Sequence, residues 1–252
     1  MTKTGSQGLA RISHREKLTS DTFDVYEYDP KGGEGVDVYI IDTGIHTHHI
    51  EFGHRASWGI TIRQHDIDED TNGHGTHCAG TVASGEYGVA KAANVIAVKV
   101  LDSDGNGTAS DVIAGVLWAA EQAAIKLAAA RAEYATTGRT NHKGSVANLS
   151  LGGRKLQALD DAVNKAVDSG LHIAVAAGND YMDACRFSPA AAEKAVTVGS
   201  STIDDKKSAS SNWGKCVDVF APGEHFHSSS QKLVSNTSRC RSRHSFNLDR
   251  EY

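Results

Sequence analysis

An aspartate and a histidine of this sequence stand in settings that suit paired acid–base chemistry. Asp42 follows the apolar run Val36–Ile41 and precedes Thr43-Gly44. A carboxylate that backbone donors hold at a strand end can orient an imidazole and stabilise its protonated form. A strand-end aspartate that only caps a turn is the alternative interpretation. We expect Asp42 to be the acid of such a pair.

The imidazole belongs to His74, in the segment NGHGTHCAG. A glycine on each side leaves little bulk around His74, and the residues up to Ala83 have a helical pattern that would anchor it, as a general base requires. His77 lies three residues further on, a spacing that would also suit a metal on one helix face. The zinc-peptidase pattern HExxH is absent, however. We therefore expect a general base at His74 and a buried structural histidine at His77.

Two later segments offer groups for substrate binding. In NLSLGG, residues 148–153, a strand ends in small residues whose backbone an extended peptide can pair with by strand addition. In AAGN, residues 176–179, the amide of Asn179 follows small residues at a strand end and can stabilise an oxyanion. An ordinary strand-to-turn junction and a turn asparagine are the alternatives.

Short runs rich in Val and Ile predict the elements that position these groups. Each run is bounded by Gly, Asp or Asn, as buried strands are. The predicted strands are Val36–Ile41, Val95–Leu101, Val146–Leu151, His172–Ala176 and Val196–Ser200.

Helical patterns lie between these strands. Ala109–Tyr134 is predicted as a helix capped by Ser110 or Asp111, and Leu156–Ser169 as a helix that Gly170 ends. Polar Ala135–Gly144 is predicted as a surface loop. Alternating strands and helices predict an α/β fold with a doubly wound, mostly parallel sheet, in which function lies at the carboxyl ends of the strands.

The composition excludes several kinds of partner. The chain has 252 residues and a net charge of -5, so it has no basic surface for nucleic acid. We find no run of about 18 apolar residues and expect no membrane helix. Met1–Ser6 is polar, without the apolar stretch of a signal peptide. We expect a monomer whose partner is a polypeptide substrate.

Taken in chain order, DTGI, HGTHCAG, LSLGG and AAGN resemble the subtilisin family of serine peptidases. The likeness is to the proteinase K branch, especially its fungal vacuolar proteases, which carry a cysteine where Cys78 stands. Gly8–Ser13 and Ser211–Gly223 also resemble that branch. The resemblance covers residues 8–223, which we take as the peptidase domain, and it implies a vacuolar or secreted location.

The resemblance assigns roles to matching residues. It makes Asp42 the triad acid, His74 the general base and Asn179 the side-chain donor of the oxyanion hole. The substrate cleft would be lined by Ser150, Leu151 and Gly152, with the loop containing Gly105 and Gly107 opposite. No cofactor is required, but the branch often binds structural calcium near the stretch matched by Ser188–Ala190 and Asp218. Asp218 is the side-chain candidate ligand.

The cysteines and the other histidines offer further possibilities. Cys78, Cys185, Cys216 and Cys240 show no zinc spacing, and Cys185 and Cys216 are candidates for one disulfide. A metal-dependent hydrolase is a distant alternative function. It would use a polar histidine loop without regular ligand spacing: His46, His48, His49 and His54.

The sequence departs from the family after Gly223. The family places its nucleophile in a Gly-Thr-Ser-Met-Ala segment, and residues 224–252 contain no such segment. They are rich in Ser and Arg without helix or strand periodicity, so we predict a disordered tail and an inactive, C-terminally incomplete chain. The lineage predicts a serine endopeptidase. A pseudoprotease that binds peptides, inhibits or acts as an antigen is the alternative.

Overall fold

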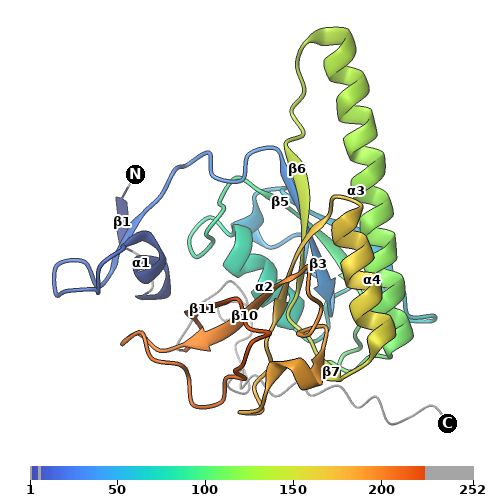
Figure 1. The fold of residues 1–252 in the computed structure, drawn as a ribbon. Coiled ribbons are helices and arrows are strands. Elements are labelled where there is room, and N and C mark those ends of the chain that lie inside the picture. Colours follow the sequence, from blue (N-terminus) through green and yellow to red (C-terminus); the bar gives the residue numbers. More distant parts are fainter. Residues whose placement is uncertain (1, 5–6, 225–252) are drawn as a thin grey trace.

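The computed structural model describes residues 2–4 and 7–224, and the predicted α/β fold is confirmed (Figure 1). Seven strands form the main sheet in the order β11-β10-β8-β6-β3-β5-β4, and every neighbouring pair is parallel. Their bounds are β3 Val36–Asp42, β4 Ala56–Thr61, β5 Asn94–Lys99, β6 Gly144–Leu149, β8 His172–Ala176, β10 Val196–Ser201 and β11 Val219–Pro222.

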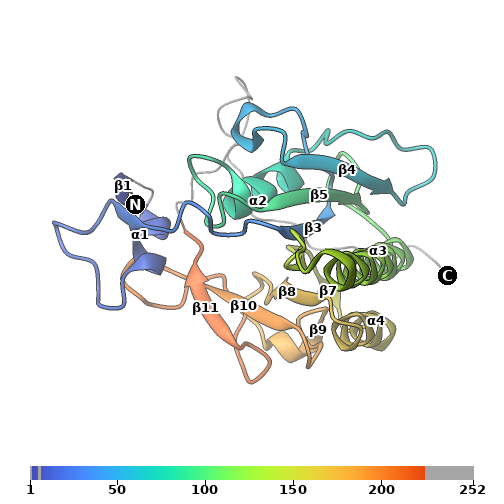
Figure 2. The same cartoon turned by 90° about the horizontal axis from the view of Figure 1, so that it is seen from above.

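Helices cover both faces of this sheet, as Figure 2 shows from above. On one face α3 (Ala109–Thr137) and α4 (Gln157–Asp168) pack over Tyr39 and Ile41 of β3. On the other face α2 (His74–Ala83) packs over Val38 and Ile40. Because β3 is buried from both sides, its sequence is almost continuously apolar, as expected of a central parallel strand.

The remaining elements are short. Two small antiparallel sheets join β1 (Thr2–Thr4) to β2 (Val25–Glu27) and β7 (Gly153–Arg154) to β9 (Phe187–Ser188). The other helical segments are α1 (Gln7–Ser13), η1 (Ile50–Phe52) and η2 (Ala184–Arg186). Of the strands in the main sheet, β4 and β11 had not been predicted, since neither forms a Val- and Ile-rich run.

Two details of α3 correct the sequence prediction. The helix is capped by Thr108, whose Oγ1 accepts from the backbone N–H of Asp111, rather than by Ser110 or Asp111. It also extends three residues past Tyr134 to Thr137 and is followed by the C-cap Gly138, which adopts the left-handed conformation with φ 69°. The first residues of the predicted loop Ala135–Gly144 are therefore helical.

Within the described residues, α3 is long and apolar enough to span a bilayer, judged by length and composition alone. Core helices of globular domains meet the same test. Val112, Val116 and Ala119 recur at helical spacing and face the core beneath the helix. Packing against the sheet thus explains the buried face of α3, whereas Leu117, Ile125 and Tyr134 of the same helix are exposed.

The predicted disulfide is present between Cys185 and Cys216, whose Cα atoms are 5.3 Å apart. It joins η2 to the segment before β11. The predicted disordered tail starts at residue 224, and its residues 225–252 lie outside the described residues.

Replacing Leu149 with alanine should lower the free energy of unfolding by about 2–5 kcal/mol. Leu149 is 0% exposed and lies in the core cluster beneath α3 and α4, so the change leaves a cavity there. Leu117→Ala on α3, where the side chain is 45% exposed, should change stability by less than about 0.5 kcal/mol. Urea unfolding followed by circular dichroism measures both. Equal losses would contradict the packing described.

Candidate functional site

The carboxylate of Asp42 lies at the carboxyl end of central strand β3 and is completely buried. A buried ionised carboxylate is costly unless it is hydrogen-bonded. The backbone N–H of Thr43 donates to its Oδ1 over 2.7 Å. This donor holds the side chain at the start of the turn, which leaves the carboxylate able to accept a second donor.

That second donor is the imidazole of His74, the first residue of α2. Its Nδ1 lies 2.8 Å from Oδ1 and 2.9 Å from Oδ2 of Asp42. The two side chains thus lie as close as an acid–base pair requires. Because an ionised carboxylate can only accept, the neutral form of His74 carries its proton on Nδ1, and Nε2 is then the basic nitrogen of the ring.

The pKa values of the two histidines on α2 shift in opposite directions. Burial alone would lower the pKa of His74, but the charge of Asp42 and its hydrogen bond raise it above the ordinary histidine value. Burial, together with the nearby His74, lowers the pKa of His77. The protonated form is therefore stabilised at His74 and disfavoured at His77. His77 is half-buried rather than fully buried, so the predicted buried histidine is not found there.

Close backbone contact brings α2 against the end of β3. A Cβ on Gly75 would lie 2.1 Å from the carbonyl oxygen of Gly44, so no larger residue fits there. Gly44 itself has φ 113°, a conformation that favours glycine. The glycine after His74 is thus needed for the approach of helix to strand as well as for open space around the imidazole.

Cys78 lies one turn after His74, and its Sγ is 3.9 Å from both Oδ2 of Asp42 and Nδ1 of His74. Among the described residues this trio brings three metal-ligand types together. The Asp42 and His74 atoms are already hydrogen-bonded to each other, so we assign no metal here. The metal interpretation that paired His74 with His77 finds no third ligand in the described part of the chain.

The predicted cleft residues follow strands that flank β3. Ser150, Leu151 and Gly152 follow β6, and no strand of the described residues pairs with them. The side chain of Leu151 is only 4% exposed and belongs to the core, so only its backbone is suited to contact a substrate. Gly105 and Gly107 lie in the loop after β5, on the other side of Asp42.

Asn179 is exposed just after β8, and a buried asparagine holds its loop in place. Nδ2 of Asn212 donates to the carbonyl of Ala177, and its Oδ1 accepts from the N–H groups of Asp180 and Met182. Gly178 has φ 99°, and a Cβ there would lie 2.4 Å from Nδ2 of Asn212. Sequence reasoning missed Asn212, although it lies in the family-like Ser211–Gly223.

Lys99 is a second residue that sequence reasoning missed. It ends β5, is 0% exposed, and donates from Nζ to the carbonyl of Thr43 over 2.8 Å. Asp66 lies 3.7 Å from the ammonium group and balances its charge. A buried charge needs such partners, and here they fix the backbone directly after Asp42. A lysine inside an apolar strand pattern is the sequence signal for this role.

The candidate calcium ligand Asp218 is already hydrogen-bonded. Its Oδ2 accepts from the N–H of Thr197 over 2.7 Å, while the hydroxyl of Thr197 donates to the carbonyl of Ala190. The two segments named from the resemblance thus meet at Thr197. They supply one carboxylate and backbone carbonyls, and calcium takes six to eight oxygen ligands, so calcium at Asp218 stays a prediction.

The histidine loop has a structural explanation. Nδ1 of His49 accepts from the N–H of Glu51 and caps η1, and its ring packs on Phe52. The ring of His46 lies edge-on to that of His49. No group of metal-ligand atoms that includes His46, His48, His49 or His54 occurs among residues 2–4 and 7–224.

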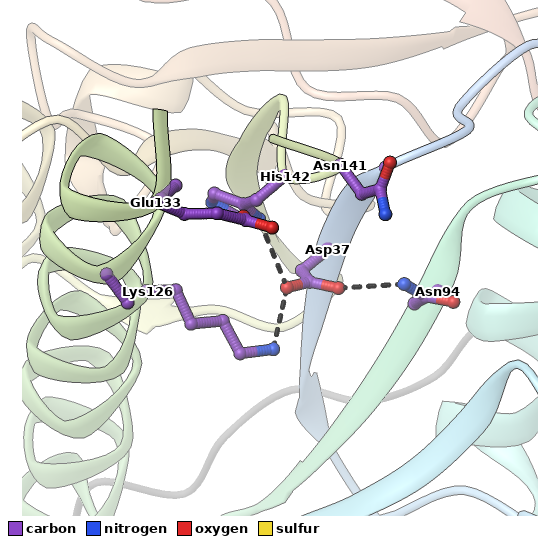
Figure 3. Close-up of a pocket in the computed structure, with 9 residues that line it drawn as sticks. Asp37, Asn94, Lys126, Glu133, Asn141 and His142 are labelled. Atoms are coloured by element: carbon purple, nitrogen blue, oxygen red, sulfur yellow. Dashed lines mark hydrogen bonds and ion pairs between the residues drawn. The ribbon is translucent and has the colours of Figure 1, made fainter. Parts of the chain in front are cut away.

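A cavity of about 610 Å³ lies at the opposite, amino-terminal end of the sheet (Figure 3). Asp37 of β3 binds Nδ2 of Asn94 over 3.0 Å and Nζ of Lys126 over 2.6 Å there, and His142 approaches to 3.6 Å. These contacts tie α3 and the loop before β6 to the sheet. The cavity is separate from Asp42 and His74, which lie at the carboxyl end.

Titration followed by NMR should show His74 losing its proton at a higher pH than His77. The Asp42–His74 pair contributes stability that is present below the ordinary histidine pKa of about 6.5 and is lost as the pH rises through the elevated pKa of His74. Asp42→Asn should remove the elevation, because asparagine carries no charge. Asp68→Asn, which alters an exposed acid bonded to Thr61, should not. A His74 that titrates below His77 in the unmodified chain would contradict this electrostatic picture.

Comparisons with known proteins agree with this fold and site. The Subtilase family profile (Peptidase S8) matches residues 33–252. The chain is 61% identical over 221 residues to the subtilisin-like serine protease Pen c 2 of Penicillium citrinum, covering 88% of this chain and 48% of that protein. It is 58% identical over 222 residues to the subtilisin-like serine protease pepC of Aspergillus niger, covering 88% and 41%.

A crystal structure of a cold-adapted subtilisin-like serine proteinase superposes with a TM-score of 0.77 at 44% identity, covering 90% of this chain and 75% of that one. The chain spans less than half the length of the curated relatives named above. The family match extends over most of the chain and includes both Asp42 and His74. This chain therefore belongs to the Subtilase family of serine peptidases.

Proposed function

We propose that this chain carries the acid and the base of a serine endopeptidase that cleaves polypeptides. The observation that carries the proposal is the 2.8 Å contact between Nδ1 of His74 and buried Asp42. In such a pair the carboxylate fixes the ring orientation and stabilises the imidazolium that forms when Nε2 takes a proton from a nucleophilic hydroxyl. The same ring then returns the proton to the leaving amine.

The groups around the pair suit an extended peptide substrate. The backbone of Ser150–Gly152 follows β6, adjacent to β3, and can pair with a peptide by strand addition. Asn179 follows β8, the next strand, and its amide can donate to the oxyanion of a tetrahedral intermediate. The glycine loop at 105 and 107 would bound the peptide on the side of β5.

The proposed function also requires a serine nucleophile, which the family carries after the position matched by Gly223. The family motif Gly-Thr-Ser-Met-Ala is not present in residues 224–252, and residues 225–252 lie outside the described part of the structure. We propose that the 252-residue chain is inactive because of this. Its acid–base pair would act on a serine hydroxyl supplied by a family-type segment after Gly223.

Peptide binding without hydrolysis is a second candidate function. It is favoured by the backbone of residues 150–152, with which no strand of the described residues pairs. Binding of a peptide to this backbone needs no nucleophile. The disulfide Cys185–Cys216 supports a vacuolar or secreted location for either function, since disulfides persist in oxidising compartments.

Serine-directed phosphonylating reagents should not label the 252-residue chain, and peptide hydrolysis should be negligible. A chain in which the residues after Gly223 are replaced by the corresponding segment of the Penicillium citrinum relative should be labelled and active. In subtilisin, a member of this family, loss of the histidine alone costs roughly a million-fold in kcat. His74→Ala in the extended chain should therefore abolish most hydrolysis, whereas His48→Ala on the exposed loop should not.

Two results would contradict the proposal. One is stoichiometric labelling of a serine in the 252-residue chain together with matching activity. The other is a folded extended chain, judged by its circular dichroism and thermal transition, that is labelled but equally active with and without His74.

Calcium at Asp218 is a further part of the proposal. Bound calcium would have a structural role, drawing together the segments that meet at Thr197. Added calcium should raise the Tm of the chain, as a ligand specific to the native state does, and Asp218→Asn should reduce this gain. Asp204→Asn, a change in an exposed turn, is the control. An unchanged Tm with calcium would argue against the site.

A further inference from the structure

The carboxylate of Asp70 gathers hydrogen bonds from three segments around the candidate site. Its Oδ1 accepts from Oγ1 of Thr43 over 2.8 Å and from the backbone N–H of Gly73 over 2.8 Å and of Asn72 over 3.2 Å. Its Oδ2 accepts from the N–H of Thr76 over 2.9 Å and from the Thr76 hydroxyl. No motif in the sequence had marked Asp70.

Thr43 and Thr76 each form a further hydrogen bond between the two segments. Oγ1 of Thr43, which donates to Asp70, accepts from the N–H of Gly75 over 2.9 Å. Oγ1 of Thr76 accepts from the N–H of His46 over 2.9 Å. The turn after Asp42 and the first turn of α2 are therefore bonded to each other twice through hydroxyls that Asp70 orients. Thr43 and Thr76 are 0% and 4% exposed, so water cannot readily replace these bonds.

The residues that form these bonds are direct sequence neighbours of Asp42 and His74. Thr43 directly follows Asp42, and Gly73 and Gly75 directly flank His74. A shift of either segment would change the separation of the Asp42 carboxylate and the His74 imidazole. Besides the bond between the two side chains and the contact of Cys78 Sγ with Asp42, the Asp70 network is a polar link that spans both segments.

The charge of Asp70 suits this arrangement. Among residues 2–4 and 7–224, no lysine, arginine or histidine forms a salt bridge with it. Its partners are N–H and O–H donors, including the N–H of the N-cap Gly73 and that of Thr76 in the first turn of α2, where a negative charge is favourable. An asparagine in its place would keep the shape but offer one acceptor oxygen instead of two.

We propose that Asp70 is a positioning residue that sets the geometry of the Asp42–His74 pair. It holds the turn after β3 against the start of α2, and it does not itself contact the substrate. The catalytic relevance of this role rests on the proposed function. The geometric role can be tested in the 252-residue chain without any activity.

The test compares Asp70→Asn with Asp68→Asn, a neighbouring acid in the same loop that accepts from Thr61 instead. The signal to follow is the far-downfield NMR resonance of the His74 Nδ1 proton, together with the pH titration of His74. Asp70→Asn should weaken or remove that resonance and shift the titration of His74 toward that of an ordinary histidine. Asp68→Asn should leave both as they are, and Asp42→Asn should abolish the resonance and remove the elevation of the His74 pKa.

A merely structural role of Asp70 predicts a different result. Asp70→Asn would then lower the unfolding midpoint, but the folded molecules would keep the resonance and the titration of the unmodified chain, and that outcome would overturn the proposal. If Asp70→Asn does not fold, Thr43→Val provides the second variant. It removes the hydroxyl that links Asp70 to Gly75 and should also weaken the resonance. A folded Thr43→Val with an unchanged resonance would equally overturn the proposal.

The extended, active chain adds a kinetic measurement. Misplacement of a catalytic group by about 1 Å can cost about a hundred-fold in rate, so Asp70→Asn should lower kcat by about 10- to 100-fold and leave KM nearly unchanged. An extended chain that is inactive even with Asp70 would count against the proposed function. It would not affect the NMR result, so the two failures are distinguishable.

Discussion

The hydrogen bond between the buried carboxylate of Asp42 and the imidazole of His74 is the interaction on which the site depends. Asp42 is completely removed from solvent at the end of the central strand, so its charge must be balanced by fixed donors. The Thr43 N–H and His74 Nδ1 supply them. Burial of Lys99 beneath the same turn, with its ammonium on the Thr43 carbonyl, keeps that turn from relaxing outward.

The parallel sheet explains why groups distant in sequence surround this pair. Carboxyl ends of parallel strands share one edge, with neighbouring strands about 4.8 Å apart. The order β8-β6-β3-β5 therefore places Asn179, Ser150–Gly152, Asp42 and the Gly105 loop in sequence along that edge. The ion-pair cluster around Asp37 lies at the opposite edge of the sheet and anchors α3. The contacts that hold α3 are therefore at the other end of the sheet from the candidate site.

Sequence reasoning anticipated the contact between Asp42 and His74 and five of the seven strands of the main sheet, and it named Cys185 and Cys216 as candidates for a disulfide. Those features leave local signals: apolar runs, flanking glycines and motif order. Asp70 leaves no such signal, and Asn212 is marked only by its place in the family-like Ser211–Gly223, because each is a single polar residue in a loop whose importance comes from hydrogen-bond partners elsewhere in the chain. The cap of α3 was misplaced by a few residues for a related reason. Thr108, Ser110 and Asp111 are all good capping residues, and only the backbone path decides among them.

The two halves of the candidate site are assembled from separate stretches of chain. Asp42, His74, Asp70 and Lys99 all lie between β3 and the end of β5, so the pair and its supports come from one stretch. The loop bearing Asn179 is held by Asn212, 33 positions further along. The sequence separations are similar, since Asp42 and His74 lie 32 positions apart, so loop-closure entropy favours neither half. The contacts that set the geometry of the Asp42–His74 pair come from residues before β6, and none of them involves the segment after Gly223.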